Sequence, residues 1–370
     1  MRVLISTIVI LHLSAFSWSQ DQRVIDSLRL ELNSNQSITE RIQTLTKLGQ
    51  SVWFSTPKIA TKYGNEVIRT VDSLISQKDN GLDAYFLLSQ KCRALRVVGV
   101  VIFDSGKRDE AIPFFKESLD IALRINHRQL IAERFADFGF MYNQLGNEEE
   151  SIKYYNQSLE IASAINDHEI LADVHSNMGR IWFANNELAK SENAMRKALR
   201  LYSDESEFRN GILANIGQIF QVRGNYDSAY LYLRDAIDFG LSHSELKGTS
   251  RAYNLMANLQ LEIGHLDSAL HYCKQAEIAA SKWGALIAKS NVSKTFYEVY
   301  KSLGDHEKAL SYYVQYHELS DSITSEKAQT DLELNRFRLE FRNSQIEDSL
   351  TRQAEDTLVE LQHEQQLQKQ

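Results

Sequence analysis

Histidine and carboxylate side chains are the first candidates for chemistry in this chain of 370 residues, because they bind metal ions and transfer protons. The ten histidines are scattered, and His168 with His175 or His265 with His271 are spaced too loosely for a metal pair on one helix. No HExxH stretch is present. The acidic run 148–150 is typical of a solvated turn. We therefore expect no metal site.

The sequence motifs for nucleotide binding and covalent catalysis are also missing. Gly99, Gly106 and Lys107 have the wrong spacing for a Walker A loop, and no strand precedes them. The chain has no Gly-x-Ser-x-Gly motif and no paired Cys/His signature. A net charge of -8 without a block of Lys and Arg argues against a nucleic-acid partner. We expect no enzyme and no cofactor; an enzyme with a site hidden among the helices is an alternative that no motif supports.

The elements that would position any site are indicated by glycines and small residues at regular spacing. In the stretch 132–162, Gly139 is followed by Gly146, and Ser151, Tyr155 and Ser158 then fall at spacings of four and three. This pattern predicts two amphipathic helices that meet at a tight turn.

Six hairpins share this template. The residue where the two helices cross is Gly99, Gly139, Gly179, Gly217, Ala257 or Tyr297. The turn residue, which must adopt a positive φ, is Gly106, Gly146, Asn186, Gly224, Gly264 or Gly304. Small residues open the second helix at Ala111, Ser151, Ser191, Ala229, Ala269 and Ala309, and bulkier ones follow at Phe115, Tyr155, Met195, Leu233, Cys273 and Tyr313. The spacing predicts close approach of the two backbones at each crossing.

This combination resembles the tetratricopeptide repeat (TPR), so we expect an all-α, TPR-type solenoid of helical hairpins forming a superhelix. The units are about forty residues apart, against about 34 in the common repeat, and the Pro that usually follows the second helix is missing. We therefore expect longer second helices, for example through 201–203 and 277–281. The array is similar to those of exported and sensory proteins of Gram-negative (Bacteroidetes-like) bacteria, especially the input halves of transmembrane signalling proteins.

Four regions are expected along the chain. Residues 1–19 are predicted to be a secretory signal peptide, because Arg2 precedes the apolar run 3–16 and small residues precede a cleavage after Ser19. Residues 20–91 are predicted to be an N-terminal helical cap with a degenerate TPR, and Pro57 lies near the start of its second helix. The six-unit array follows at 92–322, with Cys92 and Cys273 as unpaired core residues.

The last region, 323–370, is rich in charged residues and Gln and contains no Gly or Pro. Apolar residues spaced by elevens at Ala328, Leu339, Leu350 and Leu361 predict a long, coiled-coil-like helix. A solvated helix that folds back as a cap fits the same pattern. The stripe could also pair two copies of the chain, so a dimer through this helix is one expected assembly.

The resemblance implies where a ligand binds, since the first helix of each TPR hairpin lines a concave groove. The matching positions carry aromatic, amide and basic side chains, which suit a protein or peptide ligand. Asn254 and Asn258, near Arg251, resemble part of the carboxylate clamp of chaperone-binding TPR domains. The candidate groove residues are Arg93, Arg96, Phe103, Phe140, Asn143, Gln144, Arg180, Phe183, Gln218, Gln221, Arg251, Asn254, Asn258, Asn291 and Lys294.

The leading hypothesis is an exported, non-enzymatic TPR scaffold or adaptor, periplasmic or secreted, that binds a protein or peptide in its concave groove. The alternative is the periplasmic sensor region of a transmembrane signalling protein, such as a histidine kinase or nucleotide cyclase, which relays groove occupancy through the C-terminal helix. After the leader, no stretch is long and apolar enough for a membrane span.

Overall fold

The computed structural model describes residues 24–34, 36–53, 56–77, 81–105, 107–206, 208–243, 245–283 and 286–323, and all of their regular elements are α-helices. The all-α prediction is therefore confirmed for this part of the chain. Residues 24–32 and 306–323 are helical. The other helices are α2 (Ile38–Val52), α3 (Pro57–Ser76), α4 (Ala84–Asp104), α5 (Arg108–Arg124), α6 (Arg128–Gln144), α7 (Glu148–Ala164), α8 (His168–Ala184), α9 (Leu188–Leu201), α10 (Arg209–Val222), α11 (Tyr226–Ser242), α12 (Leu246–Glu262), α13 (Leu266–Trp283) and α14 (Leu286–Leu303).

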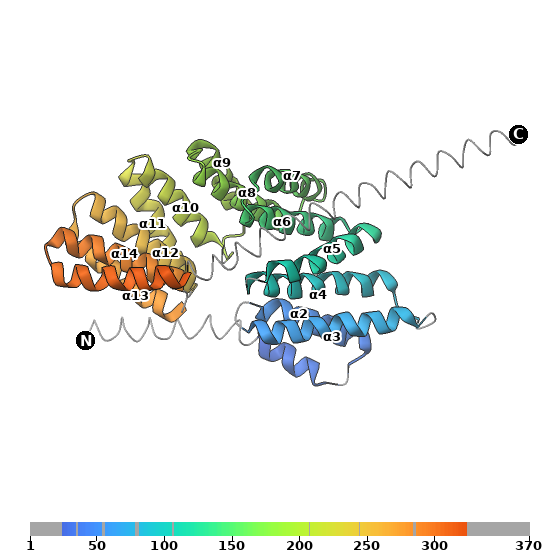
Figure 1. Cartoon of the computed structure of the whole chain (residues 1–370). Helices are drawn as coiled ribbons and strands as arrows, with labels where there is room; N and C mark the ends of the chain where they lie inside the picture. The colour runs from blue at the N-terminus through green and yellow to red at the C-terminus, as the bar shows by residue number, and fades with distance from the viewer. Residues whose placement is uncertain are drawn as a thin grey trace, which may run out of the picture.

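Neighbouring helices pair into hairpins, and the hairpins stack along an arc from α2 to α14 (Figure 1). The closest partners are α4 with α5, α6 with α7, α8 with α9, α10 with α11, and α12 with α13. Several first helices also contact the first helix of the next hairpin, for example α6 with α8 and α10 with α12. This arrangement confirms the predicted solenoid of helical hairpins.

The crossing positions are filled as the spacing predicts. A Cβ atom added to Gly139 would lie 2.6 Å from a ring carbon of Tyr155, and one added to Gly217 would lie 2.8 Å from Cγ of Leu233. Gly179 meets Met195 in the same way, at 2.9 Å. Such distances leave no room for a side chain, so each Gly lets the bulky residue of the second helix pack against the first.

Buried serines add a hydrogen bond to this packing. Ser151 donates its hydroxyl to the carbonyl oxygen of Gly139 at 2.7 Å, and Ser191 does the same with Gly179 at 2.7 Å. Ser158 donates to the carbonyl oxygen of Ala132, also at 2.7 Å. All three side chains are fully buried. These residues are therefore more than small side chains at a close contact, because they join the two helices of a hairpin by hydrogen bonds.

The turns inside the hairpins have the predicted left-handed conformation, with φ between 60° and 82° at the turn residues Gly146, Asn186, Gly224, Gly264 and Gly304. Gly106 lies outside the described residues. Two further left-handed residues, Asn126 and Asn166, have φ of 51° and 54° and follow the second helices α5 and α7. Asn tolerates this conformation better than most residues, so it ends these helices without a Gly.

The predicted longer second helices are confirmed at one site and wrong at the other. Helix α13 runs on to Trp283 and includes the segment 277–281. Helix α9 ends at Leu201 instead, because Tyr202 is extended, with ψ of 144°. Tyr202 is buried and donates its hydroxyl to Asp173, which holds the chain in a sharp departure from the helix.

The predicted first residue of the array, Cys92, falls within helix α4. Helix α4, the first helix of its hairpin, begins at Ala84 after the N-cap residue Asp83. The preceding hairpin, α2 with α3, has Pro57 at the start of its second helix, as predicted. Both Cys92 and Cys273 are buried, unpaired thiols, as predicted.

Two predicted regions, one at each end of the chain, are not covered by the described residues. The predicted signal peptide, 1–19, lies outside the described residues, and so does the predicted C-terminal helix beyond residue 323. Among the helices that are described, none combines the length and hydropathy of a membrane-crossing segment.

Candidate binding groove

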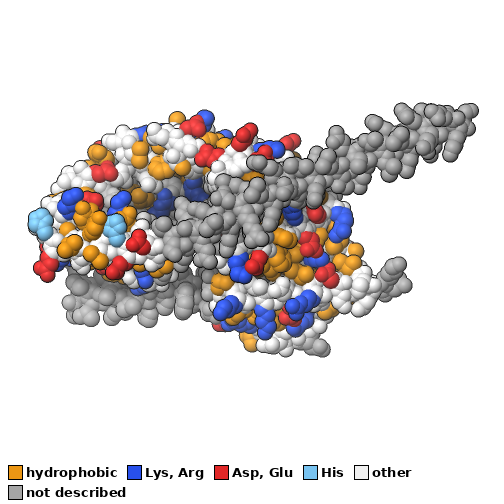
Figure 2. Space-filling model, viewed as in Figure 1, with side chains coloured by type: hydrophobic (Ala, Val, Ile, Leu, Met, Phe, Trp, Pro, Cys, Tyr) orange, Lys and Arg blue, Asp and Glu red, His pale blue; other side chains and the backbone are white. Residues whose placement is uncertain are grey.

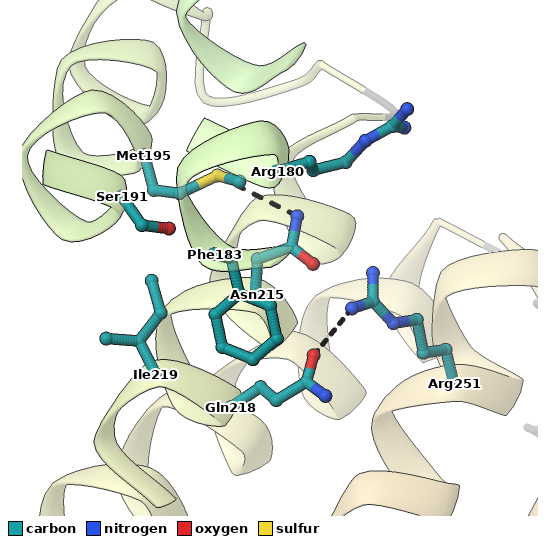
Figure 3. A pocket seen from close by; sticks show the side chains of 8 residues that line it. All are labelled: Arg180, Phe183, Ser191, Met195, Asn215, Gln218, Ile219 and Arg251. Carbon is teal, nitrogen blue, oxygen red and sulfur yellow. Dashed lines mark hydrogen bonds between the residues drawn. The ribbon is translucent and has the colours of Figure 1, made fainter. Parts of the chain in front are cut away.

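A pocket on the concave side brings four of the predicted groove residues together. Arg180 and Phe183 reach it from α8, Gln218 from α10 and Arg251 from α12, so three successive hairpins contribute (Figure 3). Its volume is about 290 Å³. The eight lining residues are Arg180, Phe183, Ser191, Met195, Asn215, Gln218, Ile219 and Arg251.

The pocket has a polar side and an apolar side. Figure 3 shows the guanidinium groups of Arg180 and Arg251 on one side, with Phe183 and Ile219 on the other. Gln218 lies beside Arg251 and accepts a hydrogen bond from its Nη2 at 2.8 Å. The pocket can therefore offer cationic donors and apolar contact area to one ligand.

The charges of the two arginines are not neutralised by the carboxylates that the structure describes. Among the described residues, no carboxylate forms an ion pair with Arg180 or Arg251. Removal from water lowers the pKa of Arg251 to about 10, and the positive charge of Arg180 adds to this effect. Both side chains are still exposed in the hollow, where Figure 2 shows basic groups beside α8 to α12.

A second pocket of about 290 Å³ adjoins the first and shares Gln218. Two further predicted residues, Gln221 and Asn258, line it together with Leu255. Gln221 donates from Nε2 to a carboxylate oxygen of Glu262 at 2.8 Å. The candidate site is therefore a groove that continues along α10 and α12, with amide groups along its length.

At the other end of the concave face, the predicted groove residue Arg96 belongs to a closed ionic network. Its Nε lies 2.9 and 3.1 Å from the two carboxylate oxygens of Asp137, and its guanidinium covers the ring of Trp53 at 5.4 Å. Burial opposes the charge of Arg96, but the charge of Asp137 outweighs it and the pKa of Arg96 is raised. Arg96 is therefore committed to an internal partner.

Arg134 completes the network from inside the protein. Its side chain is fully buried. Its Nε lies 3.0 Å from Oδ2 of Asp137, and its Nη2 lies 2.8 Å from Oε2 of Glu133. Oε1 of Glu133 also lies 3.9 Å from Nη1 of Arg93, another predicted groove residue. Charges taken out of water must be paired, and here each carboxylate meets two guanidinium groups.

Asp173 lies between the closed network and the pocket. Its carboxylate accepts the hydroxyl of Tyr202, and residues that influence its charge include Glu169, Arg96 and Asp137. Desolvation raises the pKa of Asp173 to about 6, although the hydrogen bond from Tyr202 and the charge of Arg96 act in the opposite direction. This carboxylate therefore titrates closer to neutrality than an exposed aspartate.

Other predicted groove residues lie elsewhere. Phe103 is only 5% exposed and packs between Phe115 and Phe140, so it is part of the core. The amide oxygen of Asn254 is buried and has no hydrogen-bond partner among the described residues, and Asn254 lines neither pocket, so the resemblance to a carboxylate clamp stays a prediction. The residues Asn143, Gln144, Asn291 and Lys294 line neither pocket.

Sequence reasoning missed Asn215 as well as the carboxylates that neutralise the basic residues. Asn215 and Asp137 both lie two residues before a crossing glycine, on the same face of α10 and α6. Extending the repeat alignment to this position would have placed both on the concave face. The remaining missed residues, Ser191, Met195 and Ile219, line the pocket from the hairpin core.

In the described part of the chain, His, Cys, Asp and Glu nowhere form a group of three or more that could hold a metal ion.

Comparisons with known proteins identify the repeat. Residues 130–204 match the tetratricopeptide repeat family. A comparison with curated protein sequences finds no match. The fold is similar to the apo form of the quorum sensor NprR from B. thuringiensis, at 16% identity and a TM-score of 0.59, over 85% of this chain and 88% of that one.

Two further structures share the fold at low identity. Aspartyl phosphate phosphatase F from Bacillus subtilis is 15% identical, with a TM-score of 0.55, over 90% of this chain and 91% of that one. A Rap protein complexed with competence and sporulation factor is 15% identical, with a TM-score of 0.54, over 81% of both chains.

The sequence match falls on the hairpins α6–α7 and α8–α9. The hairpin that follows, α10–α11, repeats their crossing glycine, bulky partner and left-handed turn at Gly217, Leu233 and Gly224. The same fold thus continues on both sides of the matched segment. Residues 130–204 therefore carry tetratricopeptide repeats, within a longer array of hairpins of the same fold.

Proposed function

We propose that this protein is an exported, non-enzymatic TPR scaffold or adaptor that binds a protein or peptide partner in its concave groove. The observation that carries the proposal is the pocket in which Arg180 and Arg251 lie beside an apolar side and, within the described part of the chain, form no ion pair with a carboxylate. Groups in such a hollow are partly removed from water, so a ligand that satisfies them gains more than it would on an open surface.

The lining of the groove suits a peptide in particular. The amide side chains of Asn215, Gln218 and Asn258 can donate to and accept from a peptide backbone. Phe183 and Ile219 offer apolar area for a side chain of the ligand. A neighbour in fold, the Rap protein, was solved in complex with competence and sporulation factor, which supports the same use of the fold here.

Binding through the groove can be tested with peptides selected by display on the full chain. The variant Arg251→Glu with Gln218→Ala is expected to weaken binding of the selected peptides at least tenfold, about 1.4 kcal/mol, measured by fluorescence anisotropy. A matched control, Lys274→Glu on the outer helix α13, makes the same charge reversal away from the pocket. Equal affinity of the double variant and the control would contradict the groove.

The alternative is the input region of a transmembrane signalling protein. This alternative is supported by two proteins of similar fold, a quorum sensor and a signal transduction ATPase with a tetratricopeptide repeat sensor. The ATPase matches with a TM-score of 0.51 over 54% of its length. In this alternative, groove occupancy acts on an output domain through the segment 323–370.

An immunoblot of the native protein in periplasmic, membrane and secreted fractions distinguishes the adaptor from the sensor. A soluble exported band, shortened by the predicted leader 1–19, supports the adaptor. A much larger membrane-bound band supports the sensor. A cytosolic band of full size contradicts export in both.

A further inference from the structure

We infer that the pocket between α8, α10 and α12 is an anion subsite, in which Arg180 and Arg251 bind a carboxylate of the peptide while Phe183 and Ile219 take an adjacent apolar side chain. The inference rests on the proposed function and names the ligand class of the same groove: an acidic-apolar peptide segment.

The first argument is the uncompensated charge. Arg180 and Arg251 come from different hairpins, yet they are near enough for the charge of Arg180 to disfavour that of Arg251. Among the described residues, neither has a carboxylate partner, and the partner of Arg251 is the neutral amide of Gln218. An anion bound between the guanidinium groups would replace this repulsion by two attractions.

The second argument is a vacant position in the repeat. Six residues before the six crossing residues, the first helices carry Arg93, Glu133, Asp173, Gly211, Arg251 and Asn291. Arg93 meets a carboxylate at this position in the next hairpin, since Glu133 lies 3.9 Å away. Arg251 has no acid at this position in either neighbouring hairpin: Gly211 precedes it on α10, where an added Cβ would meet no atom within 4 Å, and Asn291 follows it on α14. Arg93 thus has an acidic neighbour in this series, whereas both neighbours of Arg251 are uncharged.

The third argument is the size and chemistry of the pocket. A volume of about 290 Å³ is at the lower end of small-molecule sites, so it fits one or two amino-acid side chains. The planar guanidinium of arginine binds carboxylate and phosphate groups with two hydrogen bonds. The apolar side at Phe183 and Ile219 and the neighbouring amides favour a peptide carboxylate with an apolar neighbour.

Biased peptide libraries test this subsite on the full chain. The probes are amidated random hexapeptides with a fixed central pair of Glu-Phe, Gln-Phe, Lys-Phe or phosphoserine-Phe, and a fifth library that has a free C-terminal carboxylate and no acidic residue. We expect the Glu-Phe library to bind at least tenfold more tightly than the Gln-Phe library. Preference for the fifth library would assign the same carboxylate chemistry to a chain end instead of a side chain.

Two variants sharpen the test. Arg180→Glu with Arg251→Glu should reverse the preference toward the Lys-Phe library, whereas Lys274→Glu with Lys282→Glu, on the outer helix α13, should not change it. Gly211→Glu supplies the missing acid from the protein itself, and it should weaken the Glu-Phe library at least tenfold but leave the Gln-Phe library unaffected. A melting curve for each variant verifies that the solenoid is folded.

The outcomes distinguish the subsite from the groove. Equal binding of the Glu-Phe and Gln-Phe libraries, with loss of both in the double variant, would overturn the anion subsite and leave groove binding in place. Preference for the phosphoserine library would overturn the carboxylate assignment. Failure of all libraries to bind, with peptide display also negative, would contradict the proposed function itself.

Discussion

The two ends of the concave face use arginine in opposite ways. On α4 and α6, Arg96 and the buried Arg134 share the carboxylate of Asp137, at 2.9 and 3.0 Å. On α8 and α12, Arg180 and Arg251 are exposed and have no carboxylate partner among the described residues. Arginine in a TPR groove is therefore not by itself a sign of binding, since the residues that face it decide whether it is free for a ligand.

The difference follows from burial. A buried guanidinium without a carboxylate would be strongly destabilising, so the closed network is a condition for folding α4 against α6. The guanidinium groups of Arg180 and Arg251 are only partly removed from water, so they keep enough hydration to remain without an internal carboxylate. On α4 and α6, charged side chains thus hold neighbouring hairpins together. On α8 and α12, the two arginines remain available to bind a ligand.

The largest effect is expected from breaking the closed network. Asp137→Leu leaves Arg96 and the fully buried Arg134 without their shared carboxylate, and it should lower the free energy of unfolding by about 3–5 kcal/mol. The counterpart Arg251→Leu, in the open half, should change it by no more than about 0.5 kcal/mol. Urea denaturation followed by circular dichroism measures both. Similar losses of unfolding free energy in the two variants would contradict the proposed difference between the two halves.

Glycines on the first helices offer a second comparison, of smaller size. Gly139→Leu forces a side chain against the ring of Tyr155, now 2.6 Å from a Cβ position, and should destabilise the protein by about 1–3 kcal/mol. Gly211→Ala, in the open half, meets no atom within 4 Å and should stabilise α10 by about 0.5–1 kcal/mol. Thermal and urea unfolding measure both changes. Destabilisation by Gly211→Ala would show that the open position is not open.

The fold could be predicted from the sequence because its determinants are local and periodic. Gly139 with Tyr155 and Gly217 with Leu233 recur at one spacing, and that spacing defines a hairpin wherever it occurs. The end of α9 could not be predicted in this way, since it depends on the hydrogen bond between Tyr202 and Asp173, which comes from a different helix.

The candidate site was predictable only in part for the same reason. The repeat register placed Arg180, Gln218 and Arg251 on the concave face, where the structure has them. It also placed Arg96 there, but whether an arginine is free depends on its lateral neighbour in another hairpin, here Asp137. Such neighbours are set by the stacking of hairpins, which the residues of a single unit do not encode.

A third comparison concerns Asp173, whose helix α8 lies between the two halves. Because desolvation raises its pKa to about 6, from an ordinary 3.8, the folded protein binds more protons than the unfolded chain between about pH 4 and pH 6. The contribution of this group to stability is therefore largest at low pH and falls as the pH rises through this interval.

Asp173→Asn keeps an acceptor for the hydroxyl of Tyr202 but cannot ionise. The difference in unfolding free energy, wild type minus variant, should therefore decrease from pH 4 to pH 6 and become constant above it, as measured by urea denaturation at fixed ionic strength. A difference that rises with pH would mean that the folded protein stabilises the carboxylate, and Asp173 would then belong to the closed ionic network of Arg96 instead of marking its edge.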